Sequence, residues 1–238
     1  MKELISAAVL PAIFLLMYVR KKDKIESEPV GLVIKLFIYG GITVITAMIM
    51  ETIGLSLIKN ALDEDTMPYL IVEYFIVVAG SEEAGKYFAM KHCTWRSPEF
   101  NYTYDAIVYA VATSLGFAAA ENILYVLQGG LEIALMRALT AVPGHAVFSV
   151  FMGYHYGLAR KAAARGDYSR ESSQLAKAYI MPVLMHGFYD FCLAVGSWEF
   201  IVVFFVFYVG AVVYASRKIN KLSREDAPVN ENYYINNY

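Results

Sequence analysis

The sequence predicts an all-α membrane protein, a polytopic bundle of about seven transmembrane helices. Its 238 residues are 58% hydrophobic and only 18% charged, with a mean hydropathy of +0.45. This composition is too apolar for the water-facing shell of a soluble domain. Apolar stretches long enough to cross a bilayer recur along the chain, and Lys and Arg gather in every second connection between them. The net charge of −2 gives no basic field that would indicate a nucleic-acid partner.

Seven stretches fit the roughly 20 apolar residues that a membrane span needs, although the first is short. They cover residues 4–19, 31–58, 68–90, 103–127, 131–158, 178–195 and 198–214. The first stretch runs into the basic residues 20–22 without a small-residue cleavage site, which indicates a retained anchor rather than a signal peptide. We expect one integral membrane domain at 1–215, with its motif-bearing core at 68–195, and a polar tail at 216–238.

The connections between these spans alternate in charge, and this alternation predicts the orientation. Basic groups follow the first, third, fifth and seventh spans, at 20–24, 91–96, 160–170 and 217–224. The other connections are acidic, glycine-rich or uncharged, at 63–65, 128–130 and 196–197. Because basic connections stay in the cytoplasm, we expect the N-terminus outside and the polar C-terminal tail in the cytoplasm. One misplaced span would break the alternation, so the pattern also supports the span count.

The third span carries two adjacent carboxylates and an ammonium group, on Glu82, Glu83 and Lys86. At the bilayer centre each ionised side chain costs about 2.5 to 3.5 kcal/mol, so these residues need partners. On a helix, Lys86 lies one turn from both carboxylates and can pair with either, which leaves the other unmatched. Taken alone, the group is either a structural ion pair near the cytoplasmic end of the span or part of a functional site.

The next three spans place further polar groups at a similar depth. They are Glu121 and Asn122 on the fourth span, His145 on the fifth, and His186 with Asp190 one turn later on the sixth. Each has a plain structural explanation, as an interhelical hydrogen bond or a satisfied buried histidine. Their common depth favours one shared water-filled cavity instead, in which a carboxylate can act as a base.

The sequence lacks the motifs of three known kinds of intramembrane hydrolase. It contains no GxSG turn of the rhomboid kind, no GxGD motif of the aspartyl kind and no HExxH motif of the zincins. Once these three are set aside, the remaining scheme for an intramembrane hydrolase is one in which glutamate acts with histidine. In that scheme a glutamate takes a proton from water, and the hydroxide attacks a peptide carbonyl whose oxyanion is held by imidazole or a metal ion.

Four motifs in successive spans carry a family resemblance. They are EExxK at 82–86, FxxxEN at 117–122, Pro-Gly-His at 143–145 and HGxxD at 186–190. Each motif is weak alone, but their order and spacing together resemble the PrsW family of bacterial intramembrane proteases. That family is related to the CAAX prenyl endopeptidases and the abortive-infection membrane proteases. The resemblance covers about 69–191, most of the membrane domain.

The resemblance implies a multi-pass protease of the bacterial plasma membrane. Its partners would be the lipid bilayer and a single-span substrate, a membrane-anchored anti-sigma factor. A first cut on the extracytoplasmic side would lead to release of an extracytoplasmic-function sigma factor.

The resemblance also implies roles for the site residues. Glu82 and Glu83 would be the essential carboxylates and His186 the essential histidine, and Asp190 would match the last position of the relatives' HxxxN or HxxxD element. From the helical spacing we expect that one glutamate is the base, that Lys86 pairs the other, and that His186, oriented by Asp190, stabilises the oxyanion or binds a metal ion. Three residues would complete or support the cavity, namely His145, Glu121 and Asn122.

Departures from the prenyl-protease pattern leave the mechanism open. EExxxR becomes EExxK, which keeps a cation but loses the bidentate fork of arginine, and FxxxH becomes FxxxE, with Glu121 in the place of a histidine. A carboxylate and two histidines with a separate glutamate base are also the ligand set of a catalytic zinc site, here Glu121, His145 and His186. The sequence supports free water and zinc-bound water equally as the attacking species.

A proton- or cation-coupled transporter is the alternative function, since it would also place Glu, His and Lys at mid-membrane. Against it, no pair of spans is strongly broken by glycine and proline, and the two halves show no inverted repeat.

Overall fold

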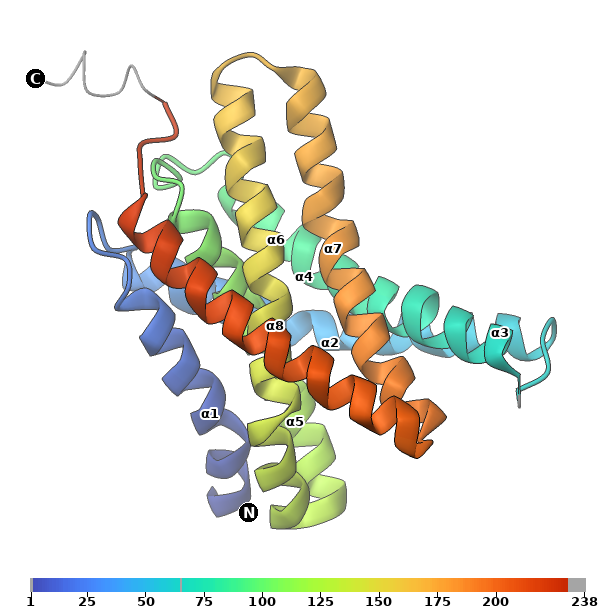
Figure 1. Ribbon diagram of the computed structural model, residues 1–238. Coiled ribbons are helices and arrows are strands. Elements are labelled where there is room, and N and C mark those ends of the chain that lie inside the picture. Colours follow the sequence, from blue (N-terminus) through green and yellow to red (C-terminus); the bar gives the residue numbers. More distant parts are fainter. Residues whose placement is uncertain (1, 65, 231–238) are drawn as a thin grey trace, which may run out of the picture.

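The computed structural model describes residues 2–64 and 66–230, and within them the chain folds into one helical bundle (Figure 1). The elements are α1 (Lys2–Arg20), α2 (Val30–Lys59), α3 (Met67–Ile71), the π-helical η1 (Val72–Val78), α4 (Ala79–Thr94), α5 (Asp105–Leu139), α6 (Ala141–Ala164), α7 (Tyr168–Val195) and α8 (Trp198–Arg224). These residues contain no strand, only an isolated bridge between Tyr102 and Pro228. The predicted all-α class is confirmed.

Five helical stretches among the described residues are long and apolar enough to cross a bilayer. They are Glu3–Arg20, Val30–Lys59, Asp105–Ala164, Tyr168–Val195 and Trp198–Arg224. The chain is therefore a multi-pass membrane protein, as predicted. The predicted span 68–90 falls within α3, η1 and α4, which follow one another without a break, and the two spans expected between 103 and 158 fall within Asp105–Ala164. The count of seven and the orientation stay predictions.

The chain reverses inside α5, at Gly130. This residue has φ 71° and ψ −160°, a backbone conformation that only glycine adopts easily. Arg137 on the returning part reaches back to Glu121, with Nη2 2.8 Å from Oε2. A second irregularity at Thr140 precedes α6. The turn expected at 128–130 is confirmed, but the helix expected at 131–158 is divided at Thr140 and continues to Ala164.

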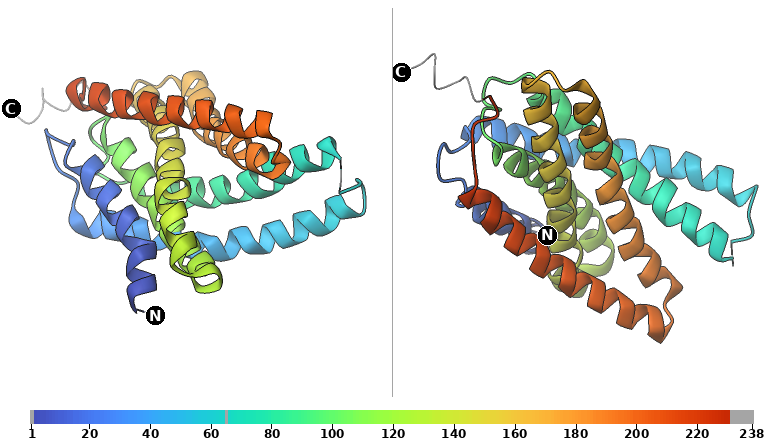
Figure 2. Two further views of the ribbon diagram at one scale, coloured as in Figure 1. Left: turned by 60° about the horizontal axis from the view of Figure 1, so that its bottom comes forward. Right: turned by 45° about the horizontal axis from the view of Figure 1, so that its top comes forward.

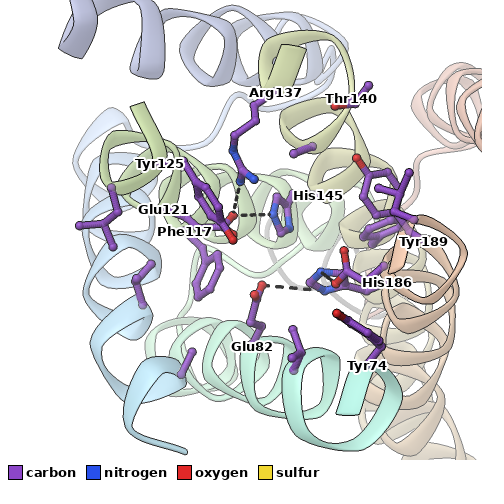
Figure 3. Close-up of a pocket in the computed structure, with 18 of the residues that line it drawn as sticks. Tyr74, Glu82, Phe117, Glu121, Tyr125, Arg137, Thr140, His145, His186 and Tyr189 are labelled. Atoms are coloured by element: carbon purple, nitrogen blue, oxygen red, sulfur yellow. Dashed lines mark hydrogen bonds and ion pairs between the residues drawn. The ribbon is translucent and has the colours of Figure 1, made fainter. Parts of the chain in front are cut away.

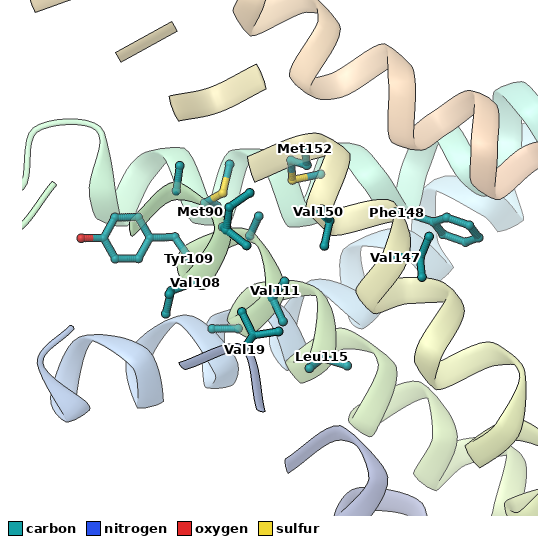
Figure 4. Packing of buried hydrophobic residues seen from close by; sticks show 14 of the residues in the cluster. Val19, Met90, Val108, Tyr109, Val111, Leu115, Val147, Phe148, Val150 and Met152 are labelled. Carbon is teal, nitrogen blue, oxygen red and sulfur yellow. The ribbon is translucent and has the colours of Figure 1, made fainter. Parts of the chain in front are cut away.

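The first part of α5 is the central helix of the bundle, and its side chains form much of the core. Figure 4 shows Tyr109, Val111 and Leu115 packed among residues of the neighbouring helices, including Met90 of α4 and Met152 of α6. Helix α2 crosses α5 closely, because a Cβ on Gly116 would overlap the backbone carbonyl group of Phe37. The central position of α5 fixes where Glu121 lies.

Large apolar side chains cover the outer faces of α2 and α8. Ile45 is 61% exposed and Val206 is 70% exposed, as a lipid-facing surface requires. Figures 1 and 2 show α2 running beside η1 and α4, with α8 crossing the bundle on the opposite side. Helix α8 continues through 216–224, into the stretch expected as a polar tail, and the last part of that tail, 231–238, lies outside the described residues.

Candidate active site

The carboxylate pair of α4 follows directly after a π-helical segment, η1. Such segments are uncommon and often occur at functional sites. Helix α7 approaches η1 closely at Gly187, where a Cβ would lie 2.7 Å from a ring atom of Phe75 and 2.9 Å from its Cα. This contact holds the adjacent His186 beside the carboxylates of α4.

The ammonium group of Lys86 binds both carboxylates. Its Nζ atom lies 3.0 Å from Glu82 Oε2 and 2.8 Å from Glu83 Oε1. It also lies 3.1 Å from His145 Nδ1 and 4.1 Å from the ring centroid of Phe117. The expectation that one carboxylate stays unmatched is therefore wrong, because one turn of helix brings both within reach of the same ammonium group.

The imidazole of His186 lies between two carboxylates. Its Nδ1 is 2.9 Å from Glu83 Oε1, and its Nε2 is 3.1 Å from Asp190 Oδ2. A doubly protonated ring satisfies both contacts, because each nitrogen then donates to an oxygen. The ring of Phe148 stacks on it, with centroids 5.4 Å apart and planes 23° apart. The structure therefore brings His186 and Asp190 together as their spacing predicts.

His145 connects Lys86 to Glu121. Because an ammonium group only donates, the contact with Lys86 makes Nδ1 of His145 an acceptor. The ring hydrogen is then on Nε2, which lies 3.1 Å from Glu121 Oε2. This arrangement describes a neutral imidazole, unlike the ring of His186.

Arg137 is the charge partner of Glu121, and sequence reasoning missed this role. Besides the ion pair with Glu121, its Nε atom donates to Asn122 Oδ1 at 3.0 Å and its guanidinium group lies 4.0 Å from the ring centroid of Tyr125. Asn122 in turn donates from Nδ2 to the carbonyl oxygen of Ala8 on α1 at 2.9 Å. Asn122 thus holds Arg137 in place and connects it to α1.

These groups border a cavity of about 850 Å³ within the bundle (Figure 3). The predicted site residues that line it are Glu82, Glu121, His145, His186 and Asp190. The predicted residues Glu83, Lys86 and Asn122 do not line it, and each of these three is 0% exposed. The site therefore has one layer that faces the cavity and a second layer behind it.

Glu51 of α2 also lines the cavity, together with Tyr74 of η1, and neither was predicted. Glu51 is the single carboxylate in the apolar span 31–58, so the criterion applied to Glu82 would have found it. Tyr74 had no such signal, because it reaches the cavity through the position of η1 against α7.

One group of donor atoms in this site could hold a metal ion. It comprises Glu82, Glu83, His145 and His186, whose ligand atoms lie within 4.8 Å of one another. Oxygen Oε2 of Glu83 is buried and has no hydrogen-bond partner among the described residues, so it is a free acceptor. The grouping differs from the expected set, because Glu121 contacts the opposite nitrogen of His145.

Comparison with known proteins decides the family. The model of the family described as "PrsW family intramembrane metalloprotease" matches residues 28–215. The chain belongs to the PrsW family. The "Protease PrsW" of Oceanobacillus iheyensis is 38% identical over 193 residues, which are 81% of this chain and 84% of that protein. The Protease PrsW of Geobacillus kaustophilus is 37% identical, over 81% and 80%, and that of Bacillus subtilis is 35% identical, over 83% and 86%. No solved structure matches the chain significantly.

Membership of the PrsW family confirms the resemblance carried by the four motifs. This chain is an intramembrane protease and a multi-pass bacterial membrane protein. The transporter alternative loses its support, because the polar cavity now has a hydrolytic explanation. The family's description names a metalloprotease, and the donor atoms around Glu83 are of the type that binds catalytic zinc, namely carboxylate oxygen and imidazole nitrogen.

Proposed function

We propose that this chain is an intramembrane endopeptidase in which Glu82 is the general base. The observation that carries the proposal is the two-layer arrangement of the carboxylates. Glu82 lines the cavity, where water and a peptide can reach it, whereas Glu83 lies behind it, bound by Lys86 and His186. A base has to lie within hydrogen-bond reach of the water that it deprotonates.

The roles of the other site residues follow from this assignment. Glu82 takes a proton from water in the cavity, and the resulting hydroxide attacks the peptide carbonyl carbon. His186, oriented by Asp190, stabilises the negative charge that develops on the carbonyl oxygen. The proton on Glu82 then passes to the leaving nitrogen, so the reaction consumes one water and returns the base. Lys86 is a positioning residue, since it touches only other side chains of the site.

The metal ion implied by the family would be held by Glu83, His145 and His186. It would take the place of the Lys86 ammonium group at Nδ1 of His145 and of the hydrogen at Nδ1 of His186. The three proposed ligands offer one carboxylate and two imidazoles, with Glu82 remaining as a separate base, which is the composition of a catalytic zinc site. The unpartnered Oε2 of Glu83 supports this set over the one with Glu121, whose oxygen Oε2 is bound by Arg137. A zinc ion supplies Lewis-acid stabilisation of the carbonyl oxygen.

We further infer that the substrate is a single-span membrane protein, a membrane-anchored anti-sigma factor, as the PrsW resemblance implies. The cavity lining includes Gln128, in the connection 128–130, and Ile201, in the first turn of α8 after the connection 196–197; both connections are expected outside the cell. An opening at that end supports a first cut on the extracytoplasmic side. The result of such a cut is release of an extracytoplasmic-function sigma factor by a later protease.

Cleavage of a single-span substrate in liposomes tests the proposal. We expect Glu82→Gln to lower the cleavage rate by about 10²–10⁴-fold, as loss of a general base does. His186→Ala should lower it as well. The matched control is Glu132→Gln, which removes the same charge from an exposed position outside the cavity lining. Full activity of Glu82→Gln would refute the assignment of the base.

The substrate class is tested separately, in cells. A strain that carries Glu82→Gln should accumulate the full-length anti-sigma factor and keep its sigma factor membrane-bound. Normal processing of the anti-sigma factor in that strain, with liposome cleavage of other single-span proteins abolished, would refute the substrate and leave the protease assignment in place.

A further inference from the structure

A second group of buried carboxylates lies far from the cavity. Asp23 and Glu28 belong to the connection between α1 and α2, and Asp105 begins α5. The distance along α5 from Asp105 to Glu121 is roughly 24 Å at 1.5 Å per residue. The three side chains are 5%, 3% and 0% exposed, and one oxygen of each lies within 4.8 Å of the others. Three buried carboxylates this close together need protons or a cation.

The protein's own hydrogen-bond donors satisfy only part of this group. Tyr109 donates its hydroxyl to Glu28 Oε2 at 2.8 Å, and the backbone N–H of Glu28 donates to Asp23 Oδ2 at 3.3 Å. Oxygen Oδ2 of Asp105 accepts from two backbone N–H groups, at 3.0 and 2.6 Å. Among the other oxygens, Oδ1 of Asp23 and Oδ1 of Asp105 are buried and accept no hydrogen bond from a donor among the described residues. The carboxyl groups of Glu28 and Asp105 also contact each other, and such a contact needs a shared proton or a cation.

No ion pair with a basic side chain neutralises the group within the described part of the chain, although the charge of Arg20 acts to lower the pKa of Asp23. The guanidinium group of Arg20 is close, but its Nη2 donates to the backbone carbonyl oxygen of Glu28 at 3.0 Å and forms no ion pair with the three carboxylates. Burial raises the pKa of Asp23 to about 6 and that of Glu28 to about 7, and the charge of Asp226 adds to the rise at Asp23. The group therefore has to bind protons or a cation to be neutralised.

We propose that Asp23, Glu28 and Asp105 bind a divalent cation that prefers oxygen ligands, of the Mg²⁺ or Ca²⁺ class. Carboxylates are the ligands that these ions prefer, and the set contains no imidazole or thiolate that would favour zinc. The bound ion joins the α1–α2 connection to the first turn of α5. Helix α5 also carries Glu121, which lines the catalytic cavity. The cation therefore stabilises the N-terminal end of a helix that helps to form the cavity.

Thermal unfolding of the full chain in detergent, after EDTA treatment and dialysis, tests this site. Addition of Mg²⁺ or Ca²⁺ should raise the unfolding midpoint of the wild type by several degrees, increasingly with cation concentration, because the ion binds the folded state. Asp105→Asn and Asp23→Asn should lose this increase. Asp23→Asn decides the matter if Asp105→Asn does not fold, because Asp23 accepts only one backbone hydrogen bond.

Glu26→Gln is the matched control, since it removes the same charge from an exposed position in the same connection. It should keep the full increase. The same midpoint at every cation concentration in the wild type would overturn the proposal and show that the group holds protons instead. An equal increase in the wild type and in both aspartate variants would also overturn it, because the cation would then bind elsewhere, for example at the cavity.

Discussion

At the scale of single residues, the two neighbouring glutamates of α4 have different surroundings. Glu83 is enclosed by Lys86 and His186, whereas Glu82 has one face toward the cavity. Sequence motifs give both residues equal weight, because they cannot tell which side of a helix turns to a cavity that other helices form. The tertiary contacts make this distinction, and it leads to different expectations for the two carboxamide variants.

Glu82→Gln and Glu83→Gln should separate catalysis from stability. In Glu83→Gln, Lys86 keeps Glu82, but Nδ1 of His186 loses its 2.9 Å contact with the charged Glu83 and retains Glu82 only at 3.9 Å. Breaking a buried pair costs about 3–5 kcal/mol. In Glu82→Gln, Lys86 keeps Glu83, so we expect a smaller loss of stability together with loss of cleavage. Unfolding in denaturant and cleavage assays measure the two effects. Equal destabilisation by both substitutions would contradict the two-layer arrangement.

Arg137 should matter for stability through Glu121. Arg137→Met removes two hydrogen bonds from a charged group, each worth about 1.5–3 kcal/mol, and leaves Glu121 with His145 alone. Arg137→Lys should keep the ion pair but lose the contact with Asn122, and so fall between the wild type and Arg137→Met. The midpoints of thermal unfolding check this order. Identical midpoints for all three proteins would show that Glu121 does not depend on Arg137.

Zinc content tests the ligands proposed for a metal ion in the active site. Loss of His145 in His145→Ala should abolish stoichiometric zinc in the purified protein, whereas Glu82→Gln should retain it, because Glu82 is assigned as base and not as ligand. His155→Ala is the control, since His155 bonds to Gln174 away from the site. Elemental analysis of the purified proteins gives the answer, and retention of zinc in His145→Ala would exclude this ligand set.

At the scale of elements, the helix boundaries were predictable where a chemical signal marks them. Gly129 and Gly130 mark the reversal within α5, and the structure confirms it. The division at Thr140 lies three residues before Pro143, which is a signal of a helix start. The π-helical form of η1 was not predictable, because no glycine or proline marks it and it depends on packing against α7 at Gly187.

The crossing of α2 and α5 should not tolerate a larger residue at Gly116. Gly116→Ala places a methyl group against the backbone of Phe37, and because backbone cannot move like a flexible side chain, we expect a loss of about 1–3 kcal/mol. Gly210→Ala on α8 meets nothing within 4 Å and should be neutral or slightly stabilising, since alanine favours helix. Comparison of the two unfolding curves tests this, and equal stability of the two variants would refute the close crossing.

At the scale of the whole molecule, composition and the positions of six ionisable residues were enough to predict an all-helical membrane protein with one shared polar site. The partners within that site were less predictable. Contacts such as His186 with Glu83 join residues that are distant in sequence, and only the packing of α4 and α7 sets their distance. The contact between Glu28 and Asp105 was not predictable for the same reason, since they meet only in the fold.

The orientation can be tested by labelling single cysteines in a background without Cys93 and Cys192. Because the connection at 63–65 is expected outside, Glu64→Cys should react with an impermeant maleimide on intact cells. Ser27→Cys should react only after the cells are permeabilised. Both positions are exposed in the fold, so differences in labelling report sidedness. The reverse pattern would invert the predicted orientation.

The attachment of Lys86 to the same helix as its two carboxylates has a consequence for how the protein is made. When α4 leaves the ribosome, α6 and α7, with their histidines, have not yet been synthesised. A counter-ion one helical turn away is present from the start, so the nascent helix can enter the bilayer with much of its charge already compensated. Replacing Lys86 by an apolar residue should therefore harm membrane insertion during translation, before any effect on the finished enzyme could arise.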